Sequence, residues 1–199
     1  MIKTPFMLAT AGLTLAATRA PETWNVDASH SAVTFEVKHF FTPVRGSFDD
    51  YQVDLVYDAE NPANSSVEAR VAIASINTGN ADRDAHLRSG DFFEADVHPY
   101  ITFRSTSVRE AAPGQLVATG PLTIKGVTRE VELPITVLGI QALPPEMQQM
   151  LGGVTRVASF QTETTVDRRD FGVGVGNWAA TLVVGGEVKI KIAVEANKR

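Results

Sequence analysis

The stretch Glu187-Val188-Lys189-Ile190-Lys191-Ile192-Ala193-Val194-Glu195 decides the fold of this chain. Apolar residues occupy every second position, and charged residues fill most of the positions between them. Successive side chains of a β-strand point to opposite faces, so this period of two predicts a strand with one dry and one solvated face. Because the pattern recurs along most of the chain, we predict a largely antiparallel sheet whose apolar faces meet.

Other segments repeat this alternation and are separated by turn residues. We predict strands at 27–41, 47–57, 67–73, 100–108, 116–124, 127–138 and 157–166, before the last one at 187–195. Between the third and fourth strands, Asn80 is a good helix cap, and residues 81–88 carry acids in the first turn and Arg88 in the last, which favours a short helix. Lys125-Gly126 predicts a tight hairpin turn.

This order of elements favours an all-β fold, an eight-stranded antiparallel barrel with one short helix between strands three and four. Eight strands leave an interior that can hold one small elongated ligand. A two-sheet sandwich with a filled core is the alternative. Pro134 falls on the outward side of the sixth strand, so that strand should lie at an edge or carry a bulge nearby. Residues 143–153 form an insertion with a possible short helix at 145–151.

Composition excludes several classes of function. The chain has 199 residues, enough for one core, and a net charge of −5 without any block of Lys or Arg. Nucleic acid is therefore not an expected partner, since its recognition needs a basic surface. No apolar run of about 20 residues occurs beyond the N-terminus, so no membrane span is expected in the mature chain. There is no cysteine, and no short spacing of the four histidines indicates a metal site.

The N-terminus has the pattern of a signal peptide at residues 1–20. Lys3 is followed by a short apolar run and then by small residues ending at Ala20, where we expect cleavage. A short buried core helix is the alternative interpretation. With cleavage, residues 21–199 form a single exported domain, which predicts a periplasmic location.

Five sequence blocks resemble the YceI family, in the same order and over essentially all of the mature chain. They are 24–31 (WNVDASHS), 35–39 (FEVKH), 77–93 (NTGNADRDAHLRSGDFF), 122–129 (LTIKGVTR) and 167–173 (DRRDFGV). The resemblance implies a lipocalin-like barrel in the periplasm or outside the cell that binds a polyisoprenoid or a related long-chain amphiphile. It implies no catalytic activity and no cofactor, and it makes a homodimer plausible. Residues 141–153 depart from the shared pattern.

Inward strand positions supply the candidate residues for holding an apolar tail. Burial of each methylene-sized group contributes about 0.8 kcal/mol, so a few isoprene units outweigh the cost of association. The alternative is that these side chains fill a dry core. The apolar candidates are Phe35, Val37, Phe103, Leu122, Leu133, Ile135, Phe160, Ile190 and Ile192.

Polar candidates for a head group are fewer. His39 is in phase with Phe35 and Val37, so we expect it to point inward near a strand end; a hydrogen-bonded core histidine is the alternative. On the short helix, Arg83 and His86 could reach an anionic group at the barrel mouth, although such cations also serve simply to support a helix.

Three functions remain open from the sequence. The favoured one is a periplasmic carrier of an isoprenoid lipid. The second is an enzyme that acts on such a lipid with His39 or His86 as general base. The third is a structural module with a filled core and no ligand.

Overall fold

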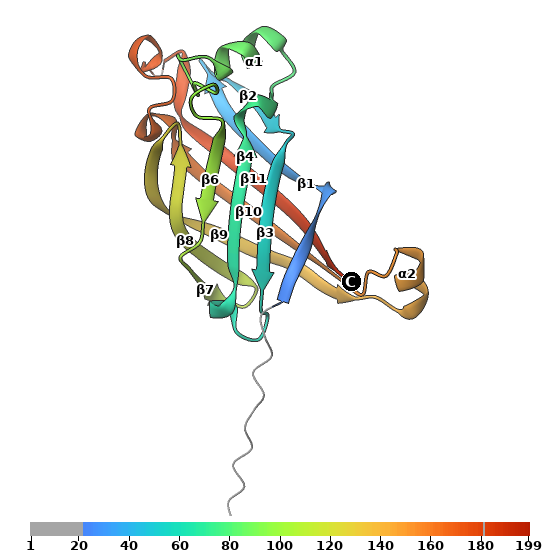
Figure 1. The fold of residues 1–199 in the computed structure, drawn as a ribbon. Coiled ribbons are helices and arrows are strands. Elements are labelled where there is room, and N and C mark those ends of the chain that lie inside the picture. Colours follow the sequence, from blue (N-terminus) through green and yellow to red (C-terminus); the bar gives the residue numbers. More distant parts are fainter. Residues whose placement is uncertain (1–21, 181) are drawn as a thin grey trace, which may run out of the picture.

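The computed structural model describes residues 22–180 and 182–199, and the segment predicted as a signal peptide lies outside them. Long antiparallel strands dominate this part of the chain (Figure 1). The strands are β1 (Glu22–His39), β2 (Thr42–Phe48), β3 (Tyr51–Tyr57), β4 (Ser66–Ala72), β5 (Ile76–Asn77), β6 (Tyr100–Arg104), β7 (Ser107–Ala112), β8 (Gln115–Ile124), β9 (Val127–Ala142), β10 (Arg156–Asp167) and β11 (Val184–Lys198). The α-helices are α1 (Ala81–Arg88) and α2 (Pro145–Met150); the 3-10 turns are η1 (Pro62–Asn64), η2 (Ile73–Ser75), η3 (Arg168–Phe171) and η4 (Gly176–Trp178).

Eight of these strands close into an antiparallel barrel, which confirms the predicted fold. Around the barrel the order is β1, β11, β10, β9, β8, β6, β4 and β3, and β3 pairs with β1 again. The β1–β11 pair aligns Phe35 with Ile190 and Val33 with Ile192. Since directly paired residues of two strands share a face, the alternating apolar side chains of both strands face the interior. The closed ladder rules out the two-sheet sandwich.

Two of the predicted strands are divided in the structure. Segment 47–57 forms β2 and β3 with a corner at Asp49 and Asp50. The carboxylate of Asp49 accepts hydrogen bonds from the Ser47 hydroxyl (2.6 Å) and the Asn77 amide (3.0 Å), which fixes the corner. Segment 100–108 divides into β6 and β7 in the same way, at Ser105.

The expectation for Pro134 is met by a bulge and not by an edge. β9 lies between β8 and β10, but its pairing with β10 ends at Ile135, so Pro134 falls just beyond that ladder. The bulge lies four residues further on, where Leu138 is the extra residue in the pairing with β10. The missing N–H of proline therefore removes no hydrogen bond on the β10 side.

The turns and helices follow the predicted chemistry. At the β8–β9 hairpin, Lys125 (φ 48°) and Gly126 (φ 73°) both adopt the left-handed conformation of a two-residue turn. Asn80 caps α1 and accepts a hydrogen bond from the N–H of Arg83 (2.9 Å). α1 lies across one end of the barrel, whereas α2 sits on the β9–β10 hairpin that projects from the other end (Figure 1). No helix among the described residues has the length and apolar character needed to cross a bilayer.

A buried arginine holds the loop that follows η3 against the start of β11. Arg168 is 5% exposed. Its guanidinium donates to the carbonyls of Gly185 (2.9 Å), Val184 (2.9 Å) and Val173 (2.8 Å), and also to those of Gly174 and Trp178. Burial lowers the pKa of Arg168. Five carbonyl partners satisfy a cation that would otherwise be too costly to bury.

Replacing this arginine should loosen one end of the barrel. We expect Arg168→Lys to lower the free energy of unfolding by about 2 to 4 kcal/mol, because an ammonium group cannot reach all of these carbonyls. Arg169→Lys is the matched control, since Arg169 is half exposed and pairs with Asp167, and it should cost much less than Arg168→Lys. Urea denaturation measures both values. Equal stability of the two variants would contradict this role of Arg168.

β1 bends sharply beside β11. Its pairing with β11 is interrupted between Asp27 and Ala32. Across this bend, Nδ1 of His30 lies 3.0 Å from a carboxylate oxygen of Asp27 and 3.7 Å from one of Glu195. Hydrogen bonds from Ser29 and then from His30 lower the pKa of Asp27 to about 2, and Asp27 in turn raises the pKa of His30.

Because of these pKa shifts, the bend is most stable at intermediate pH. The contribution of Asp27 is present above its ordinary pKa of 3.8 and is lost as the pH falls toward about 2. The contribution of His30 is present below its ordinary pKa of 6.5 and is lost as the pH rises through its higher folded value. We therefore expect NMR titration to find the Asp27 midpoint near pH 2 and to find it raised in Ser29→Ala. Ordinary midpoints for both groups would contradict the network.

Candidate functional site

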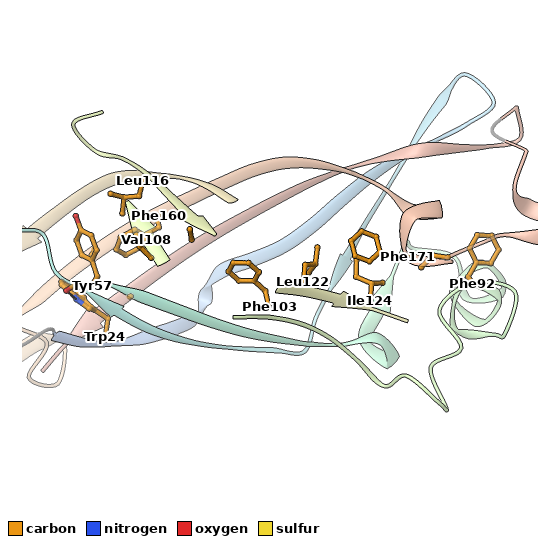
Figure 2. Packing of buried hydrophobic residues seen from close by; sticks show 14 residues of the cluster. Trp24, Tyr57, Phe92, Phe103, Val108, Leu116, Leu122, Ile124, Phe160 and Phe171 are labelled. Carbon is orange, nitrogen blue, oxygen red and sulfur yellow. Dashed lines mark hydrogen bonds between the residues drawn. The ribbon is translucent and has the colours of Figure 1, made fainter. Parts of the chain in front are cut away.

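Aromatic side chains close both ends of the barrel interior. At one end Trp24, Tyr57 and Phe160 are buried, and the rings of Tyr57 and Phe160 meet edge to face at 5.2 Å. At the other end Phe92 and Phe171 lie beneath α1. Figure 2 shows these buried side chains spread along the whole barrel between the two ends. The space between the two aromatic ends is incompletely filled.

The main cavity has a volume of about 180 Å³. Its lining contains no charged side chain, and the only polar residues in it are Thr34, Tyr57, Ser65, Ser66 and Thr162. Every strand of the barrel contributes to the wall, from Phe35 on β1 to Ile192 on β11. A cavity of this character favours apolar groups over water, because water needs polar partners to enter.

A second apolar cavity of about 100 Å³ continues from the main one toward α1. Five residues line both cavities, namely Phe35, Phe48, Ile101, Ile124 and Ile190. The ring centroids of Phe35 and Phe48 are 5.5 Å apart. Side chains that can change rotamer therefore form the shared wall, and a shift of these rings would join the two spaces.

A glycine on the neighbouring strand leaves room for the Phe35 ring. Gly46 on β2 is paired directly with Phe35, and a Cβ atom at position 46 would lie 2.4 Å from Cζ of the Phe35 ring. The ring thus packs on the backbone of β2, which only glycine leaves open. This packing sets the position of the shared wall.

A larger but polar groove lies on the outer face of β1, β2, β10 and β11, with a volume of about 850 Å³. It contains the ion pairs Arg45–Glu36 and Lys191–Glu163, both at 2.9 Å. These residues alternate with Phe35 and Ile190 along their strands and so point away from the interior. A groove lined with charged groups in contact with solvent is not suited to an apolar tail.

Most of the apolar candidates from the sequence come together around the cavities. Those that line the main cavity are Phe35, Phe103, Leu133, Ile135, Phe160, Ile190 and Ile192. Val37 lines the smaller cavity. Leu122 is buried in the core at 8% exposure but lines neither cavity.

The expectation that His39 points inward is wrong. His39 is exposed, and its ring packs edge to face against Phe40 at 4.9 Å. The pairing of β1 with β11 shifts between Val37, opposite Val188, and His39, opposite Val184. The two glycines of β11 in this interval, Gly185 and Gly186, take up the irregularity. β1 itself stays in register with β2 up to His39, opposite Thr42, so His39 is exposed because it is the last residue of the strand, beside the irregular start of β11.

The two helix candidates do not face the cavities. Arg83 is exposed, and its guanidinium donates to the hydroxyl (2.7 Å) and carbonyl (2.8 Å) oxygens of Thr78. Nε2 of His86 lies 3.0 Å from Asp91, whose pKa is lowered by the hydrogen bonds from His86 and Trp178. Both side chains therefore stabilise the α1 end of the barrel, and neither lines the two cavities.

Some cavity residues were missed by the sequence interpretation. Phe92, Phe93, Phe171 and Val173 line the smaller cavity from loops and turns, where no periodicity marks the inward side. Ile101 could have been found, since it alternates with Thr102 on the same strand as Phe103.

One group of possible metal ligands occurs among the described residues, and it lies outside both cavities. Ligand atoms of Asp27, His30 and Glu195 all lie within 4.8 Å of one another. They belong to the hydrogen-bond network at the β1 bend, where Ser29 already donates to Asp27. This network accounts for their proximity.

Comparison with known proteins adds to this geometry. The YceI-like domain family matches residues 24–196. A UPF0312 protein of Shewanella sp. (strain ANA-3) is 34% identical over 160 residues, which cover 80% of each chain. The crystal structure of Burkholderia cenocepacia BcnA superposes with a TM-score of 0.77 at 28% identity, covering 86% of this chain and 99% of BcnA.

A more distant structure shares the fold alone. It is described as a polyisoprenoid binding domain from Saccharophagus degradans, and it matches with a TM-score of 0.63 at 13% identity, over 88% of this chain and 98% of that domain. The family match covers residues 24–196, and the Shewanella relative aligns over 80% of the chain. The chain therefore belongs to the YceI-like domain family.

Proposed function

We propose that this protein is a carrier that holds the tail of a polyisoprenoid, or of a similar long-chain amphiphilic lipid, inside its barrel. The observation that carries the proposal is the uncharged cavity between the aromatic ends, with a second apolar cavity behind the wall that Phe35 and Phe48 help to form. A structural module with a filled core would not contain this cavity, since native cores are close-packed.

The size of the space bears on how a tail would be held. An apolar cavity of about 150 Å³ takes up a molecule such as benzene. The main cavity, at about 180 Å³, accommodates only a short segment as it stands. A longer tail requires Phe35 and Phe48 to move and join the two cavities. Transfer of the lipid tail from water into the barrel would supply the free energy for that movement.

The surroundings of the cavity favour binding over catalysis. A general base must approach the reacting group of its substrate. Of the two histidines that the sequence offers for this role, His39 faces solvent and His86 is hydrogen-bonded to Asp91. Among the titratable groups of the described residues, Tyr57 lines the main cavity and Arg168 lines the smaller one. Burial raises the pKa of Tyr57, which keeps it protonated, and the donors of Arg168 are occupied by carbonyls. We therefore infer a binding protein without enzymatic activity.

The same ligand class is named for the Saccharophagus degradans domain, which shares the barrel. A lipid carrier in the periplasm would also suit the signal-like residues 1–20, which we propose are cleaved to leave one domain at 21–199. There it would shield an oily chain from water between membranes.

Native mass spectrometry of the protein purified from its own host tests the proposal. We expect a co-purified lipid of defined mass and uptake of added polyprenol by the lipid-free protein. Ala69→Phe should abolish both while keeping the barrel folded, because Ala69 lines the main cavity and a benzyl group would fill it. Ala112→Phe, on an exposed position of β7, is the matched control and should carry lipid normally. Bare wild-type protein that also ignores added polyprenol would refute the proposal.

Substitutions on β1 separate the inner wall from the solvent side. Phe35→Arg should weaken lipid binding about tenfold or more, because it places a charge in the apolar wall. Phe35→Leu should keep most of the affinity, and His39→Ala should leave it unchanged because His39 faces solvent. Titration with a fluorescent polyprenol analogue, alongside circular dichroism to verify folding, provides the measurement. A loss of affinity in His39→Ala that equals the loss in Phe35→Arg would contradict the assignment of the inner face.

A further inference from the structure

The turn between β1 and β2 breaks two ordinary preferences at once. Its two residues are Phe40 and Phe41, and Phe41 is 89% exposed while Phe40 is 47% exposed. Phe40 also has a φ of 52°, in the left-handed region that bulky residues avoid. A two-residue hairpin turn favours Asn-Gly, because both residues adopt the left-handed conformation without strain and neither exposes a large apolar side chain. Strain and exposed aromatic surface at the same place indicate a functional constraint and not a folding one.

A third apolar side chain extends the exposed surface around this turn. The N–H of Phe40 donates to the carbonyl of Val183 (2.8 Å), so the chain before β11 runs next to the turn. Leu182, the neighbour of Val183, is 69% exposed. We call Phe40, Phe41 and Leu182 the apolar tip.

Charges beside the apolar tip are predominantly positive. Lys38 precedes it and is exposed, and Arg45 lies four residues after Phe41 and is also exposed. Glu36, the acid on the same hairpin, is paired with Arg45 at 2.9 Å. Exposed aromatic and aliphatic side chains flanked by cations are the combination that binds the interface of an anionic bilayer.

The apolar tip lies next to residues that line the smaller cavity. Val37 and Val184 line the smaller cavity, and Val184 is paired with His39 directly before the tip. The tip lies at the α1 end of the barrel, away from α2 (Figure 1). Contact of this end with a bilayer would place the cavity wall next to the lipid acyl chains.

We propose that the apolar tip is a membrane-docking element, which inserts into the surface of an anionic bilayer and lets lipid pass between the bilayer and the barrel. This inference rests on the proposed carrier function and adds where the carrier meets the membrane. Insertion buries the rings of Phe40 and Phe41, and the flanking cations orient the barrel with its α1 end toward the lipid.

The test uses the full chain and vesicles of phosphatidylglycerol and phosphatidylethanolamine. The double variant Phe40→Asn, Phe41→Gly restores a favoured turn sequence, so it should fold at least as well as the wild type. We expect it to bind these vesicles about tenfold or more weakly in co-sedimentation, because two buried rings are lost. The matched control is Met150→Ser, Leu151→Ser at the α2 end, where both residues are exposed, and it should bind like the wild type.

Salt and a second lipid assay complete the test. Raised salt should weaken vesicle binding of the wild type without abolishing it, since only the charge contribution is screened. The tip variant should still take up polyprenol from detergent solution but should load slowly from vesicles. Wild-type protein that ignores the vesicles, or a tip variant that binds them fully, overturns the docking proposal and leaves the carrier proposal standing. Wild-type protein that docks but takes up no polyprenol from detergent overturns the carrier instead.

A remaining outcome concerns self-association. Sedimentation velocity should show the same oligomeric state for the wild type and the tip variant. A wild-type dimer that dissociates in the tip variant, without any difference in vesicle binding, would assign the apolar tip to contact between copies and contradict membrane docking.

Discussion

The pairing of β1 with β11 is the constraint on which the rest of the structure depends. It turns an open antiparallel sheet into a closed barrel, so the inward side chains of eight strands all face one common space. Aromatic residues fill the two ends of that space, while Val, Ile and Leu line the middle together with Phe35, Phe48 and Phe103. Whether the interior is a packed core or a binding site then depends on how completely side chains fill it. Here a cavity of about 180 Å³ remains.

An unfilled apolar interior has a cost. At about 24 cal/mol for each Å³, a void of about 180 Å³ lowers stability by about 4 kcal/mol. Larger side chains at positions such as Ala69 would remove most of that cost. A bound tail would remove it too, so holding a ligand offsets the instability that the cavity creates. In the proposed function, lipid binding and incomplete packing are therefore one property of the barrel.

The sequence predicts the closed barrel because period-two alternation is a local signal that survives along each strand. Phe35 and Ile190 are found inside by that rule alone. The rule fails at the end of a strand: His39 is in phase with Val37, but it is the last residue of β1 and is exposed. It is silent on Phe92 and Phe171, which reach the interior from loops. Contacts between distant segments, such as Arg168 with the start of β11, leave no pattern in the sequence at all.

The two ends of the barrel differ in a way that matters for a carrier. The α1 end combines the smaller cavity, the loop held by Arg168 and the exposed apolar tip, whereas the other end is closed by Trp24 and by the pairing of Glu22 with Arg156 and Lys198. The proposed lipid exchange at the α1 end, away from these ion pairs, is consistent with this difference. The central claim is that the tail lies inside the barrel. A crystal structure of the protein grown with a polyprenol tests it most directly: we predict continuous density between Phe103 and Phe171 with Phe35 displaced, and an unchanged interior with the lipid on the outer surface would contradict it.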